Sequence, residues 1–208
     1  MTGLAARLWA GSADLAQEAL AHPFVRGLGD GSLPLPAFQT YVAQDALFLE
    51  SFARAYALGL ARSRDRATLE AFADLVAGVL EELRLHAAYA ERWGTVAAVE
   101  PLPATSAYTD FLLATASLGE VGPTCAAMAP CMRLYAHLGQ SLDAEAAGPY
   151  AEWVRTYADP GFEALAATLE ALLDRHATDG PDVRRAYRRA MDLELGFFSG
   201  ALRAQGLA

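Results

Sequence analysis

The sequence predicts an all-α protein, a single-domain helical bundle of roughly eight helices over residues 1–208. Three observations predict this class. Apolar residues recur at spacings of three and four along the chain, Ala, Leu, Glu and Arg dominate, and no Val- and Thr-rich run alternates as a strand would. With 208 residues, 54% of them hydrophobic, the chain can bury a core without disulfides or metal ions.

The first half of the chain divides into three expected helices. The first spans residues 4–21 and ends before Pro23, because the residue that precedes a proline avoids the α region. The glycine-rich segment 27–31 predicts a turn-rich loop. A proline in the first turn is typical of a helix start, and two long helices are expected over 34–62 and 65–93.

The second half is divided by prolines and glycines. Pro101 and Pro103 predict a loop, and Gly-Pro and Asp-Pro-Gly sequences separate most of the later helices. Five further helices are expected over residues 105–118, 122–139, 144–157, 161–177 and 181–204.

The charge balance limits the classes of partner. The chain has 25 acidic and 16 basic residues, a net charge of −9, and every basic residue is Arg. Because phosphate groups are bound by basic surfaces, we expect neither nucleic acid nor an anionic membrane as partner. The N-terminus predicts an amphipathic helix rather than a signal peptide, and we expect a cytoplasmic protein.

One carboxylate lies within an aromatic stripe of the expected helix 34–62. At 3.6 residues per turn, Asp45 falls in the middle of the face formed by Phe38, Tyr41, Phe48, Phe52 and Tyr56. A carboxylate on such a face must be paired, hydrogen-bonded or protonated. Asp45 is either a satisfied structural residue, part of a partly hydrated groove, or part of a functional site.

The last expected helix repeats this pattern. Glu194 falls among Tyr187, Met191, Phe198 and Leu202, whereas Arg185 and Arg189 lie across the helix. A buried ion pair with an arginine is the structural alternative for Glu194. Two carboxylates on separate apolar stripes predict a shared polar pocket inside the bundle.

Cys131 is a candidate nucleophile. It shares a helix face with Leu134 and Tyr135, and it follows Pro130, which lacks an N–H and should kink the helix. We expect free N–H groups beside Cys131 to favour the thiolate and lower the thiol pKa. A buried cysteine is otherwise a small hydrophobic residue, which suits Cys125. The two lie roughly 9 Å apart along one helix, too far for a disulfide.

The remaining motifs point away from metal chemistry. Glu82 and His86 form an i, i+4 pair for which we expect a structural hydrogen bond. A carboxylate-bridged di-iron bundle requires two Glu-x-x-His pairs, and the sequence has none. We therefore expect no metal site.

Several segments resemble the thiaminase II (TenA) family, in order and over nearly the whole chain. The N-terminal motif comprises His22-Pro23-Phe24-Val25, Gly27-Leu28-Gly29-Asp30-Gly31, Leu33-Pro34, Phe38, Tyr41 and Gln44-Asp45. The central motif is Ala129-Pro130-Cys131-Met132-Arg133-Leu134-Tyr135. The segments Trp153–Tyr157 and Glu194–Phe198 resemble the C-terminal motifs. The family has a branch with a central cysteine and a branch without it. Because Cys131 is present, this sequence resembles the first branch.

The resemblance implies a fold similar to haem oxygenase, a homotetramer, and an enzyme of thiamine salvage. The implied reaction hydrolyses 4-amino-5-aminomethyl-2-methylpyrimidine to 4-amino-5-hydroxymethyl-2-methylpyrimidine (HMP) and ammonia, with slower cleavage of thiamine. The substrate is then a small molecule, and no metal or organic cofactor is required.

The resemblance also implies roles for individual residues. Cys131 is the expected nucleophile and Glu194 the acid and base, while Asp45 holds the amino edge of the pyrimidine and Phe48 stacks on its ring. The expected pocket tyrosines are Tyr108, Tyr135 and Tyr157. Leu47 departs from the family, where a second aromatic residue is frequent, and leaves the substrate preference open.

Two other functions remain open. An oxygenase on the same fold would need an axial histidine, for which His22 is the candidate, and a basic rim that the net charge of −9 opposes. A non-catalytic pyrimidine-binding protein or regulator would have no use for the Cys131 thiol.

Overall fold

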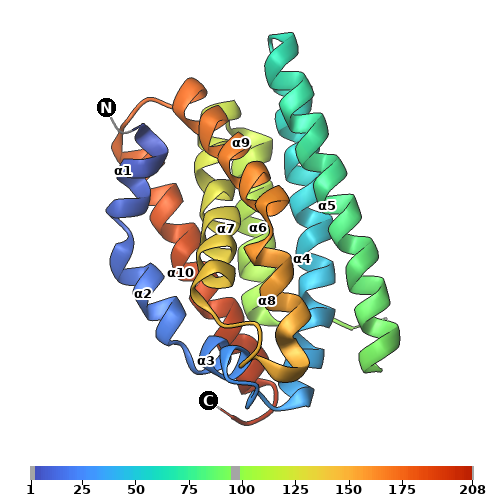
Figure 1. Cartoon of the computed structure of the whole chain (residues 1–208). Coiled ribbons are helices and arrows are strands. Elements are labelled where there is room, and N and C mark those ends of the chain that lie inside the picture. The colour runs from blue at the N-terminus through green and yellow to red at the C-terminus, as the bar shows by residue number, and fades with distance from the viewer. Residues whose placement is uncertain (1–2, 95–98, 208) are drawn as a thin grey trace.

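The described part of the chain consists of ten α-helices and one short 3₁₀ helix, without a strand (Figure 1). This computed structural model describes residues 3–94 and 99–207, without the side chains of residues 85, 86 and 88–92. The helices are α1 (Leu4–Ala10), α2 (Ala13–Ala21), α3 (Pro23–Gly29), α4 (Leu35–Arg62), α5 (Arg66–Trp93), α6 (Pro103–Leu118), α7 (Val121–Ser141), η1 (Gly148–Tyr150), α8 (Ala151–Ala158), α9 (Pro160–His176) and α10 (Pro181–Arg203). The all-α prediction is confirmed, and the additional helices lie near the N-terminus.

The expected first helix is two helices. It breaks between α1 and α2, where Gly11 ends the first helix and the backbone of Ser12 leaves the helical conformation. Ser12 is buried and precedes α2 as its N-cap residue. The break lets α1 contact α9 while α2 packs on α10.

The expected glycine-rich loop is wrong, because most of it forms α3. Pro23 begins this helix, and Nδ1 of His22 accepts a hydrogen bond from the backbone N–H of Phe24 at 3.2 Å. Phe24, Val25 and Leu28 are fully buried. Each buried side chain of this size contributes roughly 1.5–3 kcal/mol, which outweighs the helix cost of the glycines.

Helix α7 is the centre of the bundle, and it packs against α6, α8, α9 and α10. Figure 1 shows α8 and α9 on one side of α7, with the long pair α4 and α5 beside them and α1 to α3 on the opposite flank. Helix α4 packs against both α5 and α6. The buried apolar side chains form one core that extends from Leu4 to Leu202.

Close contacts fix α8 and α9 on α7. A Cβ atom at Gly139 would lie 2.4 Å from the backbone carbon of Tyr157, so only glycine allows α8 this near. On the neighbouring face, the Arg133 guanidinium donates to Glu163 and Glu170 of α9 over 2.7–2.9 Å. Such bidentate pairs fix orientation as well as distance, so they hold α7 and α9 in register.

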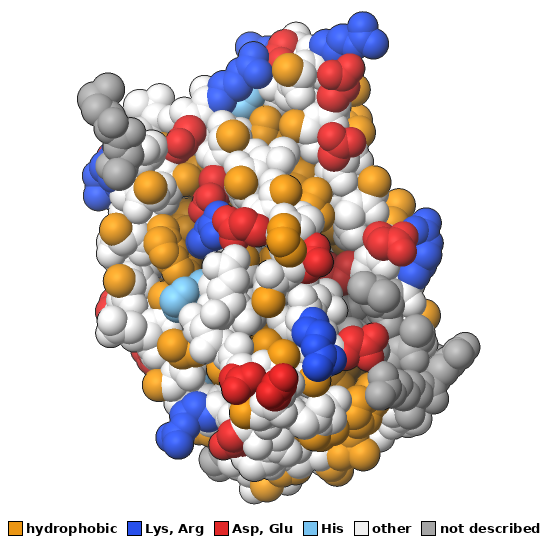
Figure 2. Space-filling model, in the orientation of Figure 1, with side chains coloured by type: hydrophobic (Ala, Val, Ile, Leu, Met, Phe, Trp, Pro, Cys, Tyr) orange, Lys and Arg blue, Asp and Glu red, His pale blue; other side chains and the backbone are white. Residues whose placement is uncertain are grey.

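The surface mixes acidic and apolar side chains. On the face that includes α5, α8 and α9, Figure 2 shows red carboxylates spread among orange apolar groups. Among the described residues, no helix is long and apolar enough to cross a membrane.

Candidate active site

A small cavity inside the bundle brings together five of the seven residues expected at the site. Its described lining comprises Asp45, Phe48, Leu49, Phe52, Glu82, Cys131, Met132, Tyr135, Tyr157 and Phe162. These side chains come from α4, α5, α7, α8 and α9. The cavity volume is about 10 Å³, room for a single water molecule.

The other two expected residues, Tyr108 and Glu194, lie one layer deeper. The Tyr108 hydroxyl donates a hydrogen bond of 2.7 Å to Oε1 of Glu194, and both residues are 1% exposed. Glu194 therefore pairs with a phenol rather than with the arginine considered as its structural alternative. The Cys131 thiol also interacts with the Glu194 carboxyl group, which links this deeper layer to the cavity wall.

Glu194 is poised to exchange a proton. Burial raises its pKa from 4.5 to about 7, against the smaller opposing effects of the hydrogen bonds from Tyr108 and Cys131. The charge of Asp45 raises it further. A carboxyl group with this pKa is populated in both protonation states near neutral pH, as a general acid and base must be.

The expectation of a lowered Cys131 pKa is wrong. Burial raises the pKa of this thiol well above its usual value, and the nearby carboxylates of Glu194 and Asp45 raise it further. Helix α7 continues through Pro130 to Ser141. A proline inside a helix removes a donor, so Pro130 frees a carbonyl and no N–H groups. Glu194, rather than the helix, is the group placed to accept the thiol proton.

A chain of hydrogen bonds orients Tyr135 at the cavity wall. Nε1 of Trp153 donates to the Tyr41 hydroxyl at 3.3 Å, and the Tyr41 hydroxyl donates to that of Tyr135 at 3.2 Å. Because Tyr135 accepts in this chain, its own proton is available to the cavity. Asp45 lines the same cavity and is 3% exposed.

Phe48 presents an aromatic wall beside the nucleophile candidate. Its ring centroid lies 4.7 Å from that of Tyr108 and 5.8 Å from that of Phe197. These contacts hold the Phe48 ring in place, and its position suits stacking on a planar ligand. Phe197 and Phe198 are both buried, whereas the sequence analysis placed only Phe198 on the inner stripe. Leu47 is not among the described residues that line the cavity.

Glu82 also lines the cavity, a position that the sequence analysis did not assign to it. The Tyr157 hydroxyl donates to Oε1 of Glu82 at 2.7 Å, which ties α8 to α5 across the cavity. The expected pairing of Glu82 with His86 lies outside the described residues, since the side chain of His86 is not among them. The only sequence signal for Glu82 was its place at the edge of an apolar stripe.

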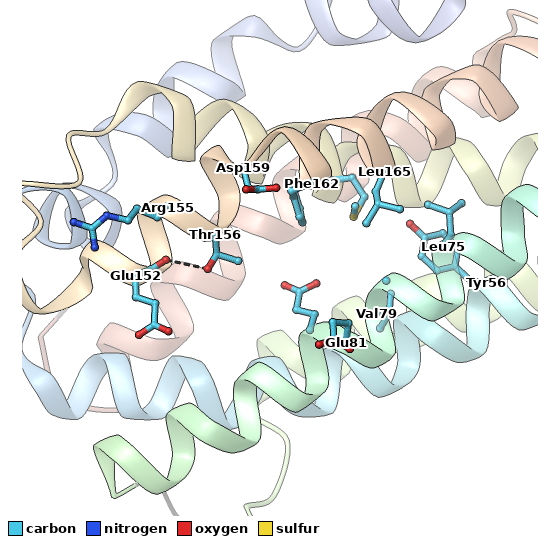
Figure 3. Close-up of a pocket in the computed structure, with 13 residues that line it drawn as sticks. Tyr56, Leu75, Val79, Glu81, Glu152, Arg155, Thr156, Asp159, Phe162 and Leu165 are labelled. Atoms are coloured by element: carbon cyan, nitrogen blue, oxygen red, sulfur yellow. Dashed lines mark hydrogen bonds between the residues drawn. The ribbon is translucent and has the colours of Figure 1, made fainter.

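A larger groove opens beside the cavity. Figure 3 shows it between α5 on one side and α8 and α9 on the other, with Tyr56 at one end and Glu152 and Arg155 toward the other. Its volume is about 500 Å³, and it shares Glu82, Met132 and Phe162 with the inner cavity. The three shared residues lie between the two spaces.

The site offers carboxylates, a thiol and phenols, but no recognisable metal ligand set. The described residues contain no group of three or more His, Cys, Asp or Glu that could hold a metal ion. His22 lies elsewhere: Nδ1 caps α3, and Nε2 is 2.9 Å from the Ser199 hydroxyl. Both ring nitrogens are thus engaged, so His22 is not placed as an axial ligand.

The fold and this cavity define a class, namely all-α proteins with a thiol and a proton-exchanging carboxyl group in a small aromatic pocket. The TENA/THI-4/PQQC family matches residues 9–204, and the chain belongs to this family. The resemblance to the TenA family is thereby confirmed.

Two relatives and two solved structures are informative. The aminopyrimidine aminohydrolase of Halalkalibacterium halodurans is 39% identical, over 75% of this chain and 74% of that protein. That of Bacillus subtilis is 33% identical, over 76% and 67%. A TenA family transcription regulator from Silicibacter sp. TM1040 superposes with a TM-score of 0.89 at 31% identity, covering 96% of this chain and 97% of that one. A TenA homologue from P. horikoshii OT3 gives 0.86 at 26% identity, covering 97% and 99%.

Proposed function

We propose that the protein is an aminopyrimidine aminohydrolase of thiamine salvage. It would hydrolyse 4-amino-5-aminomethyl-2-methylpyrimidine to HMP and ammonia, and cleave thiamine more slowly. The observation that carries the proposal is the Cys131 thiol on the cavity wall in contact with Glu194, whose pKa is about 7. Two relatives named aminopyrimidine aminohydrolase, at 39% and 33% identity, support the substrate class.

The first chemical step uses the thiol and its carboxyl partner. Glu194 takes the Cys131 proton, and the sulfur electron pair forms a bond to a carbon of the pyrimidine ring. The ring electrons move to a ring nitrogen, which receives a proton from the carboxyl group of Glu194. The product of this step is a dearomatised ring joined to the enzyme through sulfur.

The second half restores the ring and releases both products. The electron-rich ring expels the protonated 5-amino group as ammonia and leaves an exocyclic methylene. Water then adds to the methylene and gives a proton to Glu194, which passes it to the released ammonia. The carbon–sulfur bond breaks as the ring becomes aromatic again, and the proton on the ring nitrogen returns to the sulfur, which regenerates the thiol and gives HMP. The sum is one water consumed and one ammonia released. None of these reaction steps requires a cofactor.

Three side chains would hold the substrate during these steps. Asp45 would bind the 4-amino edge, Phe48 would stack on the ring, and Tyr135 would donate its available proton to a ring nitrogen or to water. Tyr108 would position Glu194 through its 2.7 Å hydrogen bond, and Tyr157 would position Glu82. The cavity of about 10 Å³ is smaller than a pyrimidine ring, so its lining side chains would move apart when the substrate enters. The buried position then favours these contacts because water does not compete for them.

The same proposal includes the domain organisation, the family branch, the assembly and the location of the protein. Residues 1–208 would form one domain of the family branch with the central cysteine, assembled as a homotetramer in the cytoplasm. Leu69, Leu80 and Leu118 are 43%, 46% and 90% exposed, which supports further burial in an assembly. Light scattering at micromolar concentration would show a tetramer, and a monomeric mass would contradict it.

The test measures ammonia release from a panel of 5-substituted 4-aminopyrimidines, and HMP release from thiamine, whose hydrolysis frees the thiazole rather than ammonia. We expect the 5-aminomethyl compound to give the highest kcat/KM, with HMP as the second product. No ammonia from any member of the panel would reject the proposal.

The rival functions fit the site less well. One similar solved structure is that of a TenA family transcription regulator, but the net charge of −9 opposes DNA binding and a regulator does not require a thiol beside a titrating carboxyl group. For a haem oxygenase, His22 is already committed to capping α3. A Soret band on addition of haem would revive that alternative.

A further inference from the structure

The groove outside the cavity has the size and the position expected of a binding subsite. It has a volume of about 500 Å³, whereas the inner cavity has about 10 Å³. Glu82, Met132 and Phe162 line both spaces and so lie between them. Because the inner cavity has no room for a sizeable substituent, a ligand whose reacting carbon lies at Cys131 would extend past these shared residues into the groove.

Charge in this region favours a cation. Three carboxylates, those of Asp45, Glu82 and Glu194, act on Cys131 from three different helices and raise its pKa after the dominant effect of burial. None of the described residues that line the inner cavity is basic. The described residues that line the groove include one arginine, Arg155, and four carboxylates, those of Glu81, Glu82, Glu152 and Asp159. A positively charged group would be attracted to this region.

A second observation comes from Tyr56 at the inner end of the groove. This residue is fully buried, it lines the groove, and its hydroxyl has no hydrogen-bond partner among the described residues. A buried hydroxyl without a partner costs roughly 1–3 kcal/mol, so its oxygen is an unused acceptor beside the groove. Tyr187 shares this lack of a partner but lines neither space.

We propose that the groove between α5 and α8–α9 holds the positively charged 5-substituent of the aminopyrimidine, with Glu82 as its specificity-determining residue. This inference rests on the proposed function. The 4-amino group and the 5-substituent project from adjacent ring atoms, and Asp45 and Glu82 lie on the adjacent helices α4 and α5. A ring bound through Asp45 can therefore direct its substituent to Glu82, and the nearby Tyr56 oxygen is a second acceptor for the same cationic group.

The test compares a charged and a neutral substituent. The probes are 4-amino-5-aminomethyl-2-methylpyrimidine, its uncharged N-acetyl derivative, and HMP. Affinities are measured by calorimetry in the Cys131→Ser background, so that no turnover occurs. We expect Glu82→Gln to weaken the cationic ligand by about 10- to 100-fold, the usual effect of losing a charge-assisted hydrogen bond, and to change the two neutral ligands by less than about threefold.

The matched control is another glutamate of α5. Glu70 is not among the described residues that line either space, its side chain is 62% exposed and it pairs with Arg66. Glu70→Gln should change all three affinities by less than about threefold, because solvent screens an exposed charge. Equal weakening of charged and neutral ligands in Glu82→Gln, or equal effects of Glu70→Gln and Glu82→Gln, would overturn the inference.

The two buried tyrosines give an independent comparison. Tyr56→Phe should weaken the cationic ligand by about 3- to 10-fold, while Tyr187→Phe should leave it unchanged. An unchanged affinity in Tyr56→Phe would remove Tyr56 from the subsite. The binding readout separates this inference from the proposed function: charge preference without turnover would reject only the function, and turnover without charge preference would reject only the inference.

Discussion

Cys125 and Cys131 lie on the same helix and are both buried, yet they face different surroundings. Cys125 is 0% exposed and packs into the core, where burial raises its thiol pKa to about 12. Cys131 is 8% exposed and lines the cavity, where Glu194 and Asp45 add to the effect of burial on its pKa. Both thiols are thus held protonated in the free protein. The two thiols differ in their access to a base, because Glu194 interacts with Cys131 and not with Cys125.

The comparison shows how a buried cysteine becomes a nucleophile in this fold. Activation by a positive environment would lower the thiol pKa in the resting protein, and the structure shows the reverse. Activation by a neighbouring base keeps the thiol neutral until a substrate is present. The resting protein then has a thiol that resists oxidation, since reactivity follows thiolate character.

The largest expected effect separates the two cysteines directly. Cys131→Ser should lower kcat by a factor on the order of 10³ or more, because a hydroxyl is a far weaker nucleophile than a thiolate. HMP affinity should persist. Cys125→Ser should keep kcat within about threefold, and steady-state ammonia release measures both. Equal losses in the two variants would break the comparison and indicate a structural effect.

The next effect tests the base itself. Glu194→Gln should lower kcat by about 10²–10⁴-fold, the range for loss of a general acid and base, with HMP affinity changed by less than about threefold. Calorimetry of HMP binding, together with kcat, distinguishes a role in proton transfer from a role in substrate binding. A variant that bound HMP poorly but turned over normally at saturation would show that Glu194 binds substrate instead.

The raised pKa of Glu194 also predicts how folding stability depends on pH. Because the folded-state pKa lies above the unfolded value of 4.5, the contribution to stability is complete below about pH 4.5 and is lost as pH rises through about 7. The free energy of unfolding should fall by roughly 3 kcal/mol more in the wild type than in Glu194→Gln between pH 4 and 8. Denaturant titrations at both pH values measure this difference. If the free energy of unfolding changed equally with pH in the wild type and in Glu194→Gln, the raised pKa of Glu194 would be contradicted.

The smallest effect concerns the substrate anchor. Asp45→Asn should weaken HMP and substrate alike by about 10- to 100-fold, because a carboxylate contact to the amino group is lost in the ground state and the transition state. The kcat at saturation should change less than in Glu194→Gln. If Asp45→Asn lost most of its kcat but kept its HMP affinity, Asp45 would be the acid and base and not the substrate anchor.

Helical periodicity was a reliable guide to the inner faces of α4 and α10. Asp45 and Glu194 were predicted to lie on apolar stripes, and they are 3% and 1% exposed. Periodicity was less reliable where helices are short. The segment that forms α3 contains Gly27 and Gly29, and only the burial of Phe24 and its neighbours explains why it is helical.

The sequence by itself determined the helical class, the family, and which side chains face the interior, because 3.6-residue periodicity and motif order are local properties of the chain. The tertiary structure alone decided what those side chains meet. Tyr108 reaches Glu194 across 86 residues, and Tyr157 reaches Glu82 across 75. It also reversed the expected direction of the Cys131 pKa, since the carboxylates that raise it come from α4, α5 and α10. Burial and charge depend on distances between helices, and no spacing within one helix contains that information.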